Sequence, residues 1–194
     1  MARASTLCRV ADEMDCAFDD LSMRKRSALV RIAEADTEEA VNAARALIVE
    51  YAAALSIDLS FQDFEKEMAG LPGEYASPDG RLLLAFAETS SGGPRGLAGC
   101  VALRRMDRDT CEMKRLYVRR EFRGQGAGRA LALAVIGIAR DIGYRWMRLD
   151  TLPLMQEAQV LYRSLGFREI PPYRVNPVPG AVFLELTLTD TVRS

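Results

Sequence analysis

The sequence predicts a mixed α/β (α+β) fold in which a mostly antiparallel sheet carries helices on both faces. Three observations indicate this fold: short apolar runs recur as candidate strands, stretches with helical spacing separate some of them, and tight turns link others directly. Strands joined by turns pair antiparallel, whereas helices between strands cover the faces of a sheet. With 194 residues and 49% hydrophobic content, the chain suits one domain with a sizeable core.

The first third of the chain predicts one strand followed by two helices. The strand covers residues 28–35, and Asp36 then stands three residues before Glu39, an arrangement typical of a helix N-cap. The helix that follows has an apolar face at helical spacing, made of Val41, Ala44, Ile48, Tyr51 and Leu55. A second helix is expected to start at Ser60 and to end at a turn, with apolar positions at Phe61, Phe64 and Met68 before Leu71-Pro72-Gly73.

The rest of the chain predicts six strands and two helices. The strands are expected over residues 81–88, 97–105, 111–118, 146–151, 167–170 and 181–187. One helix ends at Gly143, because glycine is common just after a helix C-terminus, and its apolar side holds Leu131, Ala134, Val135, Ile138 and Ile142. The other helix runs from about residue 154 to 165 and stops at Gly166. The expected order is β-α-α-β-β-β-α-β-α-β-β.

A glycine-rich loop, Arg123-Gly124-Gln125-Gly126-Ala127-Gly128, is the feature most informative about function. It follows an apolar strand and opens a helix, and its glycines let backbone approach a ligand closely because they lack a Cβ. Amide groups at a helix start have no internal partner and lie at the positive end of the helix dipole. With Arg119, Arg120 and Arg129 around it, the loop predicts a phosphate or pyrophosphate site.

Two other phosphate-binding signatures fit this loop less well. A dinucleotide-binding G-x-G-x-x-G motif needs glycine where Arg129 stands, although Asp150 ends a strand at a suitable distance. A P-loop needs Gly-Lys-Ser/Thr, which the chain lacks. A plain turn before a helix explains neither the glycines nor the surrounding arginines. The loop therefore predicts a phosphate or pyrophosphate site that matches neither nucleotide-binding signature.

The composition excludes several kinds of chemistry. The chain has no histidine, which excludes His-based triads, His-ligated metals and a His general base. The cysteines lack the CxxC spacing of a metal site, so no metal is expected at Cys8, Cys16, Cys100 or Cys111. A net charge of −1, reduced thiols and the lack of a signal peptide or a long apolar run predict a cytoplasmic protein without nucleic-acid or membrane partners.

Three motifs together resemble the GNAT superfamily of N-acetyltransferases. They are Leu116-Tyr117-Val118, Arg123-x-x-Gly126-x-Gly128 and Leu161-Tyr162-x-x-Leu165-Gly166-Phe167, in the order and spacing of that family. The resemblance covers residues 28–190 and implies an acetyltransferase domain whose central strands splay apart. Residues 1–27 are then an N-terminal extension, either a short helix or a partly ordered arm.

The resemblance implies that acetyl-CoA binds as co-substrate on the glycine loop. Backbone amides of the loop would hold the pyrophosphate, and the strand before it would pair with the pantetheine arm. The residues implied to bind the cofactor are Leu116, Tyr117, Val118, Arg123, Gly124, Gln125, Gly126, Ala127, Gly128 and Arg129. Seven residues before its catalytic tyrosine the family often has Asn, where this chain has Met155.

The catalytic residues implied by the resemblance are Tyr162 and Glu112. A Tyr at the position of Tyr162 often protonates the departing CoA thiolate in this family, and a Glu on the strand before the loop often serves as general base. An ammonium group cannot attack a thioester, and burial can raise the pKa of a Glu toward the operating pH. Both residues also fit a purely structural role. Tyr162 shares a helix face with Leu161 and Leu165, as a core tyrosine would, and Glu112 stands near a strand start, where a Glu is commonly exposed to solvent.

The sequence thus predicts an enzyme that transfers acetyl from acetyl-CoA to a primary amine by direct attack in a ternary complex. A small-molecule amine is favoured over a histone-like tail, since no acidic run offers a groove for basic peptides. The alternative is a non-catalytic acyl-CoA-binding module that acts as sensor or partner. The wall of the acceptor site is expected around Tyr51, the segment 61–68 and the loop at Tyr75. Whether the protein forms a homodimer is left open.

Overall fold

The computed structural model describes residues 29–55, 64–89 and 93–189, so the predicted N-terminal extension, Ser60 and Phe61 lie outside the described residues. The described strands are β1 (Leu29–Glu34), β2 (Arg81–Glu88), β3 (Pro94–Arg105), β4 (Thr110–Val118), β5 (Trp146–Thr151), β6 (Arg168–Ile170) and β7 (Val182–Thr187). The helices are α1 (Glu38–Leu55), α2 (Phe64–Gly70), α3 (Ala127–Ile142) and α4 (Gln156–Ser164), with short 3₁₀ turns η2 (Gly73–Tyr75) and η3 (Arg120–Phe122). This order confirms the predicted succession of elements.

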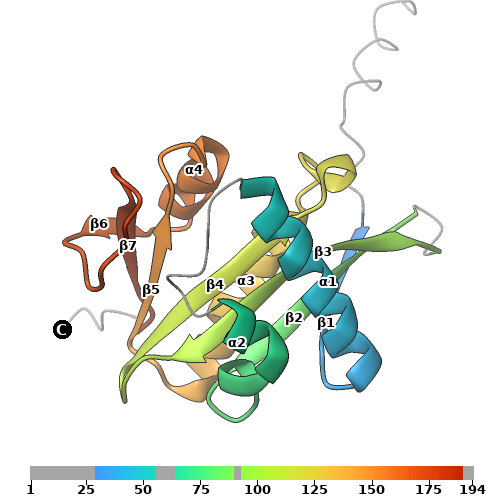
Figure 1. Cartoon of the computed structure of the whole chain (residues 1–194), viewed down its shortest axis with the longest axis horizontal. Coiled ribbons are helices and arrows are strands. Elements are labelled where there is room, and N and C mark those ends of the chain that lie inside the picture. Colours follow the sequence, from blue (N-terminus) through green and yellow to red (C-terminus); the bar gives the residue numbers. More distant parts are fainter. Residues whose placement is uncertain (1–28, 56–63, 90–92, 190–194) are drawn as a thin grey trace, which may run out of the picture.

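The strands form one sheet in the order β1-β2-β3-β4-β5-β7-β6, with helices on both of its faces (Figure 1). Every strand pair is antiparallel except β4 and β5, which run parallel. Consecutive strands joined by turns account for the antiparallel pairs β2–β3 and β3–β4. The predicted mixed, mostly antiparallel sheet is therefore confirmed.

Two separate apolar cores lie on the two faces of this sheet. Because side chains alternate along a strand, Leu82 and Leu84 of β2 face the α1 side, whereas Leu83 faces the α3 side. The core under α1 and α2 includes Leu47 and Ile48 of α1. The opposite core gathers Leu131, Val135 and Ala139 of α3 with residues of β5 and with Tyr162 of α4. Apolar residues on both faces explain why β2 reads as an almost continuous hydrophobic run.

Two helix starts differ from their prediction. Helix α1 begins at Glu38 and its cap is Thr37, whose hydroxyl accepts a hydrogen bond from the Ala40 amide at 3.2 Å, so the prediction of Asp36 as the cap is wrong. Helix α4 begins at Gln156 instead of about residue 154. A turn closed by the Met155 amide on the Leu152 carbonyl at 3.0 Å occupies the preceding residues.

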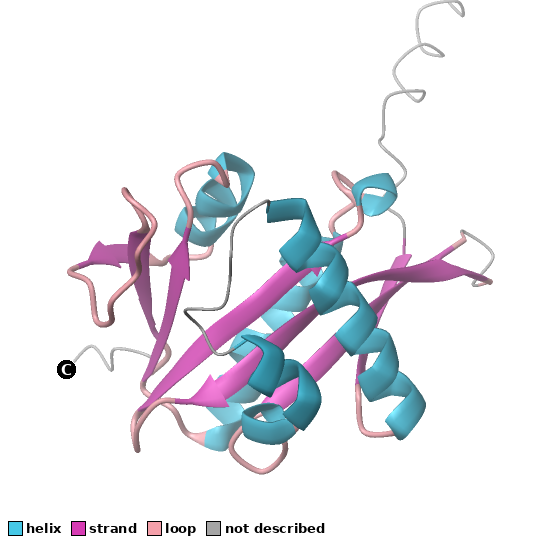
Figure 2. Cartoon of the chain, in the orientation of Figure 1, coloured by secondary structure: helices cyan, strands magenta, loops and turns pink. Residues whose placement is uncertain are grey.

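Strands β4 and β5 splay apart, as the family resemblance implies. They pair only where Thr110–Glu112 meets Trp146–Arg148, whereas β4 continues to Val118 and β5 to Thr151. Figure 2 shows the two strands diverging from this short paired segment toward α4 and the end of α1. The divergence opens the middle of the sheet, and the candidate site lies there.

We predict that Leu131→Ala lowers the free energy of unfolding by about 2–5 kcal/mol, because it leaves a cavity in a closely packed core. Leu131 is 0% exposed, while Leu133 on the same helix is 50% exposed. Leu133→Ala is therefore the matched control, with an expected change within about 0.5 kcal/mol. Urea unfolding measures both variants, and equal losses would contradict the assigned faces of α3.

Candidate functional site

The glycine loop joins the end of β4 to the start of α3 in a conformation that its glycines make possible. Gly126 caps α3 at φ 92° and Gly124 has φ 71°, values in the left-handed region that favours glycine. The Arg123 side chain donates from Nε to the Val118 carbonyl at 3.0 Å and fastens the loop to β4. The first amides of α3 have no acceptor within the helix, so the loop presents backbone donors at a positive helix end.

The arginines around the loop have different surroundings. Arg119 forms a bidentate pair with Glu50 of α1, with Nε–Oε2 at 2.9 Å and Nη2–Oε1 at 2.5 Å. Arg129 donates to the Ser164 hydroxyl of α4 at 3.0 Å. Arg119 is therefore engaged in holding α1 to the end of β4, whereas Arg129 connects α3 to α4 beside the loop.

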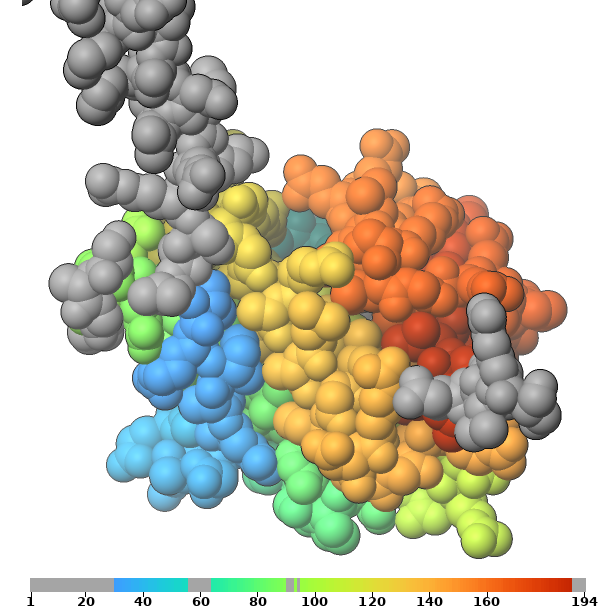
Figure 3. All heavy atoms as spheres, turned by 180° about the vertical axis from the view of Figure 1, so that it is seen from behind, coloured from blue at the N-terminus to red at the C-terminus, as the bar shows by residue number. Residues whose placement is uncertain are grey.

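A large hollow of about 790 Å³ lies beside the glycine loop. Figure 3 shows its opening between the start of α3 and α4, with part of α1 at the base. Of the predicted cofactor residues, the hollow is lined by Leu116, Tyr117, Val118, Arg123, Gly124, Gly126, Ala127, Gly128 and Arg129. Gln125 does not line it, and its side-chain Nε2 instead donates to the Glu121 backbone carbonyl at 2.8 Å. The structure thus brings the predicted cofactor residues, except Gln125, around one space.

A smaller inner hollow of about 60 Å³ adjoins the large one in the splayed part of the sheet. The two hollows share walls formed by Tyr51, Leu55, Leu116, Leu152 and Met155. The inner hollow is also lined by polar and charged residues that do not line the large one: Lys114, Arg115, Asp150, Thr151, Tyr162 and Asn176. A long ligand in the large hollow can therefore present one end to the polar residues of the inner hollow.

A β-bulge in β4 shapes the boundary between the two hollows. The register of β3 and β4 shifts between the pairs Ala102–Lys114 and Cys100–Tyr117, and Arg115 between them has φ 57°. Past the bulge the backbones approach closely, since a Cβ on Gly99 would lie 2.2 Å from the Tyr117 carbonyl oxygen. Strand β5 pairs with none of the β4 residues beyond Glu112, so that edge of β4 faces the hollows.

The side chain of Arg115 forms a buried clamp with α2. Its Nε and Nη2 donate to the two carboxylate oxygens of Glu67 at 2.9 and 2.6 Å, and the Tyr75 hydroxyl donates to the same carboxylate at 2.6 Å. Burial alone would raise the pKa of Glu67, but the bonds from Arg115 and Tyr75 hold it below its ordinary value. The clamp uses the Tyr75 hydroxyl, and Tyr75 lines neither hollow, so its predicted place in the acceptor wall is not supported.

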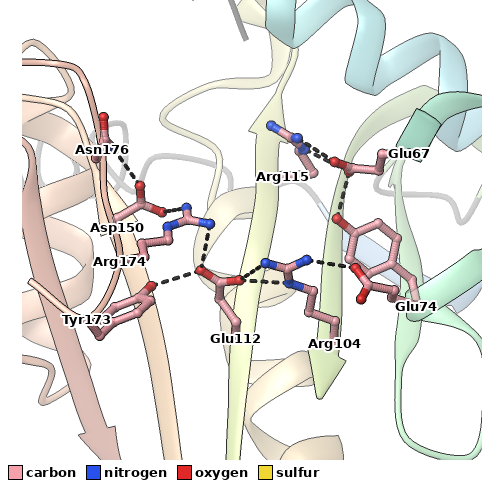
Figure 4. Close-up of polar contacts among 10 residues, drawn as sticks. Glu67, Glu74, Arg104, Glu112, Arg115, Asp150, Tyr173, Arg174 and Asn176 are labelled. Carbon is pink, nitrogen blue, oxygen red and sulfur yellow. Dashed lines mark hydrogen bonds and ion pairs between the residues drawn. The ribbon is translucent and has the colours of Figure 1, made fainter. Parts of the chain in front are cut away.

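Glu112 lies at the centre of a buried ionic network on the same face of the sheet as the pair of Arg115 and Glu67 (Figure 4). Its carboxylate accepts hydrogen bonds from Arg104 Nε at 2.8 Å and from the Tyr173 hydroxyl at 2.9 Å, and pairs with Arg174 at 3.4 Å. Burial alone would raise the pKa of Glu112, but Lys114, Arg174 and Arg104 together hold it below its ordinary value.

These contacts correct the expectation that burial raises the pKa of Glu112. A general base works best with a pKa near the operating pH. A carboxylate with a lowered pKa, occupied oxygens and no place in the lining of either hollow is poorly suited to take a proton from the acceptor. The geometry favours Glu112 as a residue that positions Arg174 and Lys114.

Arg174 bridges the opening between β4 and β5. It pairs with Glu112 on β4 and donates to Asp150 at the end of β5, while the Asn176 amide donates to the second Asp150 oxygen at 2.8 Å (Figure 4). Arg174 and Asn176 belong to the loop between β6 and β7, which β7 brings here by pairing with β5. Sequence reasoning missed both residues, because the proline-rich loop itself carries no periodic or motif signal.

Tyr162 lies on α4 with its side chain in the inner hollow and is 6% exposed. Its ring packs edge-on against Phe167 with centroids 5.7 Å apart. Burial raises the pKa of its hydroxyl above the usual value, so the group is protonated at neutral pH. Nearby, the Tyr51 hydroxyl contacts the Met155 sulfur at 3.9 Å, at the position where the family often has Asn.

Burial limits the reactivity of the two described cysteines. The thiols of Cys100 and Cys111 are free and buried, and burial raises the pKa of each to about 12, which makes them weak nucleophiles. Among the described residues there is no group of three or more His, Cys, Asp or Glu side chains placed to hold a metal ion. The described helices also include none that is long and apolar enough to cross a membrane.

Comparison with known proteins identifies relatives of this arrangement. Residues 48–167 match the family model of the acetyltransferase (GNAT) family. An uncharacterized N-acetyltransferase of Schizosaccharomyces pombe is 38% identical over 144 residues, which cover 74% of this chain and 85% of the relative. One from Dictyostelium discoideum is 33% identical over an alignment 222 positions long, which covers 82% of this chain and 99% of the relative.

Solved structures share the fold at lower identity. An acetyltransferase from Streptococcus agalactiae has a TM-score of 0.64 and 20% identity, covering 81% of this chain and 98% of that one. The Salmonella typhimurium protein yncA, solved with its cofactor acetyl-CoA, has a TM-score of 0.54 and 21% identity, covering 84% of this chain and 96% of that one.

We predict that the clamp makes stability depend on acid pH. Because the folded-state pKa of Glu67 lies below its ordinary value of 4.5, its contribution is present above that pH and is lost as the pH falls through the folded pKa. Glu67→Gln should lower the free energy of unfolding at pH 7 by about 3 kcal/mol, because it leaves Arg115 buried without its counter-charge. It should also flatten the fall in stability between about pH 5 and 3.

Urea unfolding across this pH range measures the effect. Glu65→Gln is the matched control, since Glu65 is exposed on the same helix. An unchanged pH dependence in Glu67→Gln would contradict the assignment of the clamp.

Proposed function

This chain belongs to the acetyltransferase (GNAT) family and is an acyltransferase, and on that premise we propose that it transfers an acetyl group from acetyl-CoA to a primary amine of a small molecule. The observation that carries the proposal is the pair of adjoining hollows, which share five lining residues and extend from the glycine loop to Tyr162. The helix start beside the loop would bind the phosphates, and the Tyr162 phenol lines the other hollow. The acetyl-CoA bound to the related fold of yncA supports the choice of co-substrate.

The cofactor would lie along the large hollow. Its pyrophosphate would accept hydrogen bonds from the amides at the start of α3, where the helix dipole and Arg129 favour negative charge. Its pantetheine arm would pair with the free edge of β4 along Leu116 and Val118, in place of the missing β5 partner. The thioester would then reach the inner hollow beside Tyr162.

The transfer is a direct displacement within a ternary complex. The acceptor loses its ammonium proton to water, since the described residues that line the hollow include no histidine and Glu112 is occupied. The neutral nitrogen attacks the thioester carbon, the new C–N bond forms and the C–S bond breaks. The nitrogen then releases its second proton to water, which leaves the neutral amide. The departing thiolate takes a proton from the Tyr162 hydroxyl, which solvent restores. Donation of this kind contributes about 100-fold or more to a rate.

The first test is isothermal titration with acetyl-CoA, with NADH and ATP as controls. We expect selective binding of acetyl-CoA in the micromolar range, and Gly128→Trp should abolish it. A Cβ on Gly128 would lie 3.6 Å from Val118 and 3.8 Å from Leu161, so a larger side chain must extend into the hollow. Gly128→Ala fits in ordinary contact and is the control. Retained binding in a folded Gly128→Trp protein would contradict the location of the cofactor.

Tyr162→Phe should lower the turnover number about 100-fold, measured by release of CoA thiol, while the affinity for acetyl-CoA stays unchanged. Tyr144→Phe is the matched control. Tyr144 is also a buried tyrosine, and its hydroxyl donates to the Asp79 carbonyl at 2.8 Å, outside both hollows. Its removal should leave turnover intact. Equal turnover in Tyr162→Phe and the parent protein would remove Tyr162 from the role of general acid.

A further inference from the structure

The charged residues that line the inner hollow are two bases and one acid, Lys114, Arg115 and Asp150. The acid is paired, because its two oxygens accept hydrogen bonds from Arg174 and Asn176. Arg115 is likewise paired with Glu67, and Glu112 acts on Lys114. The lining therefore carries one more positive than negative charge. Such a surface favours an anionic group on the ligand.

The two bases hold their charge in a place that disfavours it. Lys114 is 8% exposed, and burial together with the charges of Arg174, Arg115 and Arg104 lowers its pKa to about 8, against the opposing effect of Glu112. The bonds of Arg115 to Glu67 use its Nε and Nη2. A ligand carboxylate beside these side chains would add a negative charge where burial makes the electrostatic interaction strong.

An independent observation also points to a polar ligand in the same hollow. The Thr151 hydroxyl is buried without a hydrogen-bond partner. Among the described residues it is the only buried side-chain oxygen or nitrogen that lacks one. Thr151 is 4% exposed and lines the inner hollow. An unsatisfied buried hydroxyl costs about 1–3 kcal/mol, which a ligand oxygen or nitrogen would recover.

We propose that the acceptor is an amine that carries a carboxylate, as an amino acid does, with the carboxylate held at Lys114 and Arg115. The inference rests on the proposed acetyl transfer and adds the class of its substrate. Once the amine has lost its proton, the carboxylate is the remaining charge of such an acceptor, and it matches the basic lining. The amine end then lies toward Leu116 and Tyr162, where the thioester arrives, and Thr151 bonds to the polar part between them.

A basic peptide tail fits the inner hollow poorly, since its positive charges would face Lys114 and Arg115. The same two side chains would attract the negative charge of a free amino acid or a close derivative.

The test is a matched panel of acceptors in the thiol-release assay, each L-amino acid paired with its α-carboxamide and its decarboxylated amine. We expect kcat/KM for the acids to exceed that for the amides by about tenfold or more, as one charge-assisted bond would give. Lys114→Met should abolish this ratio, mainly through KM, whereas Lys114→Arg should keep it. Lys66→Met is the control, because Lys66 is exposed on α2 and lines neither hollow.

The outcomes separate this inference from the proposed function. Turnover of amides and simple amines as fast as of acids, or an unchanged ratio in Lys114→Met, would overturn the carboxylate site and leave acetyl transfer standing. Bound acetyl-CoA with no thiol release for any member of the panel would overturn the acetyl transfer and this inference with it. Faster reaction of phosphoethanolamine than of any amino acid would contradict the carboxylate in favour of a phosphate.

A second measurement needs no variant and covers the case in which Lys114→Met does not fold. The products, N-acetyl-amino acids and their amides, are compared as inhibitors of the unmodified enzyme. We expect the acids to inhibit with a constant about tenfold lower than the amides. Equal inhibition by both would overturn the carboxylate site.

Discussion

The separation of β4 from β5 is the constraint on which both hollows depend. Adjacent parallel strands normally form backbone hydrogen bonds along the length that they share. Here the pairing of β4 with β5 stops at Glu112 and Arg148, although both strands continue. The bulge at Arg115 turns β4 at this point, and the buried pair with Glu67 holds the bulge against α2. An unpaired strand edge in the middle of a sheet is thereby offered to a ligand.

Side chains replace the missing backbone ladder across the opening. Glu112, Arg174 and Asp150 form a chain of opposite charges from β4 through the β6–β7 loop to β5. Buried ion pairs add little net stability, but losing one partner leaves an uncompensated charge that costs several kcal/mol. We infer that these residues maintain the distance between the two strands and the charge balance of the inner hollow, more than they stabilise the fold.

The sequence could predict those parts of the site that are built from consecutive residues. The glycine loop from Arg123 to Gly128 and the order of the strands and helices follow from local patterns, and most of the predicted cofactor residues line one hollow. Met155, where the family often has Asn, contacts Tyr51 and still lines both hollows. Predictions that depended on a residue's surroundings were less successful, as the pKa of Glu112 and the place of Tyr75 show.

The amino-acid sequence by itself determined the element order, the left-handed glycines of the loop and the apolar faces, because each depends on neighbours within a turn or a strand. Only the tertiary structure decided that Arg174 and Asn176 meet Asp150, that Glu112 is surrounded by bases, and that the Thr151 hydroxyl lacks a partner among the described residues. Those facts depend on strands distant in sequence that pair through β7, and on burial, which sets the strength of every charge at the site.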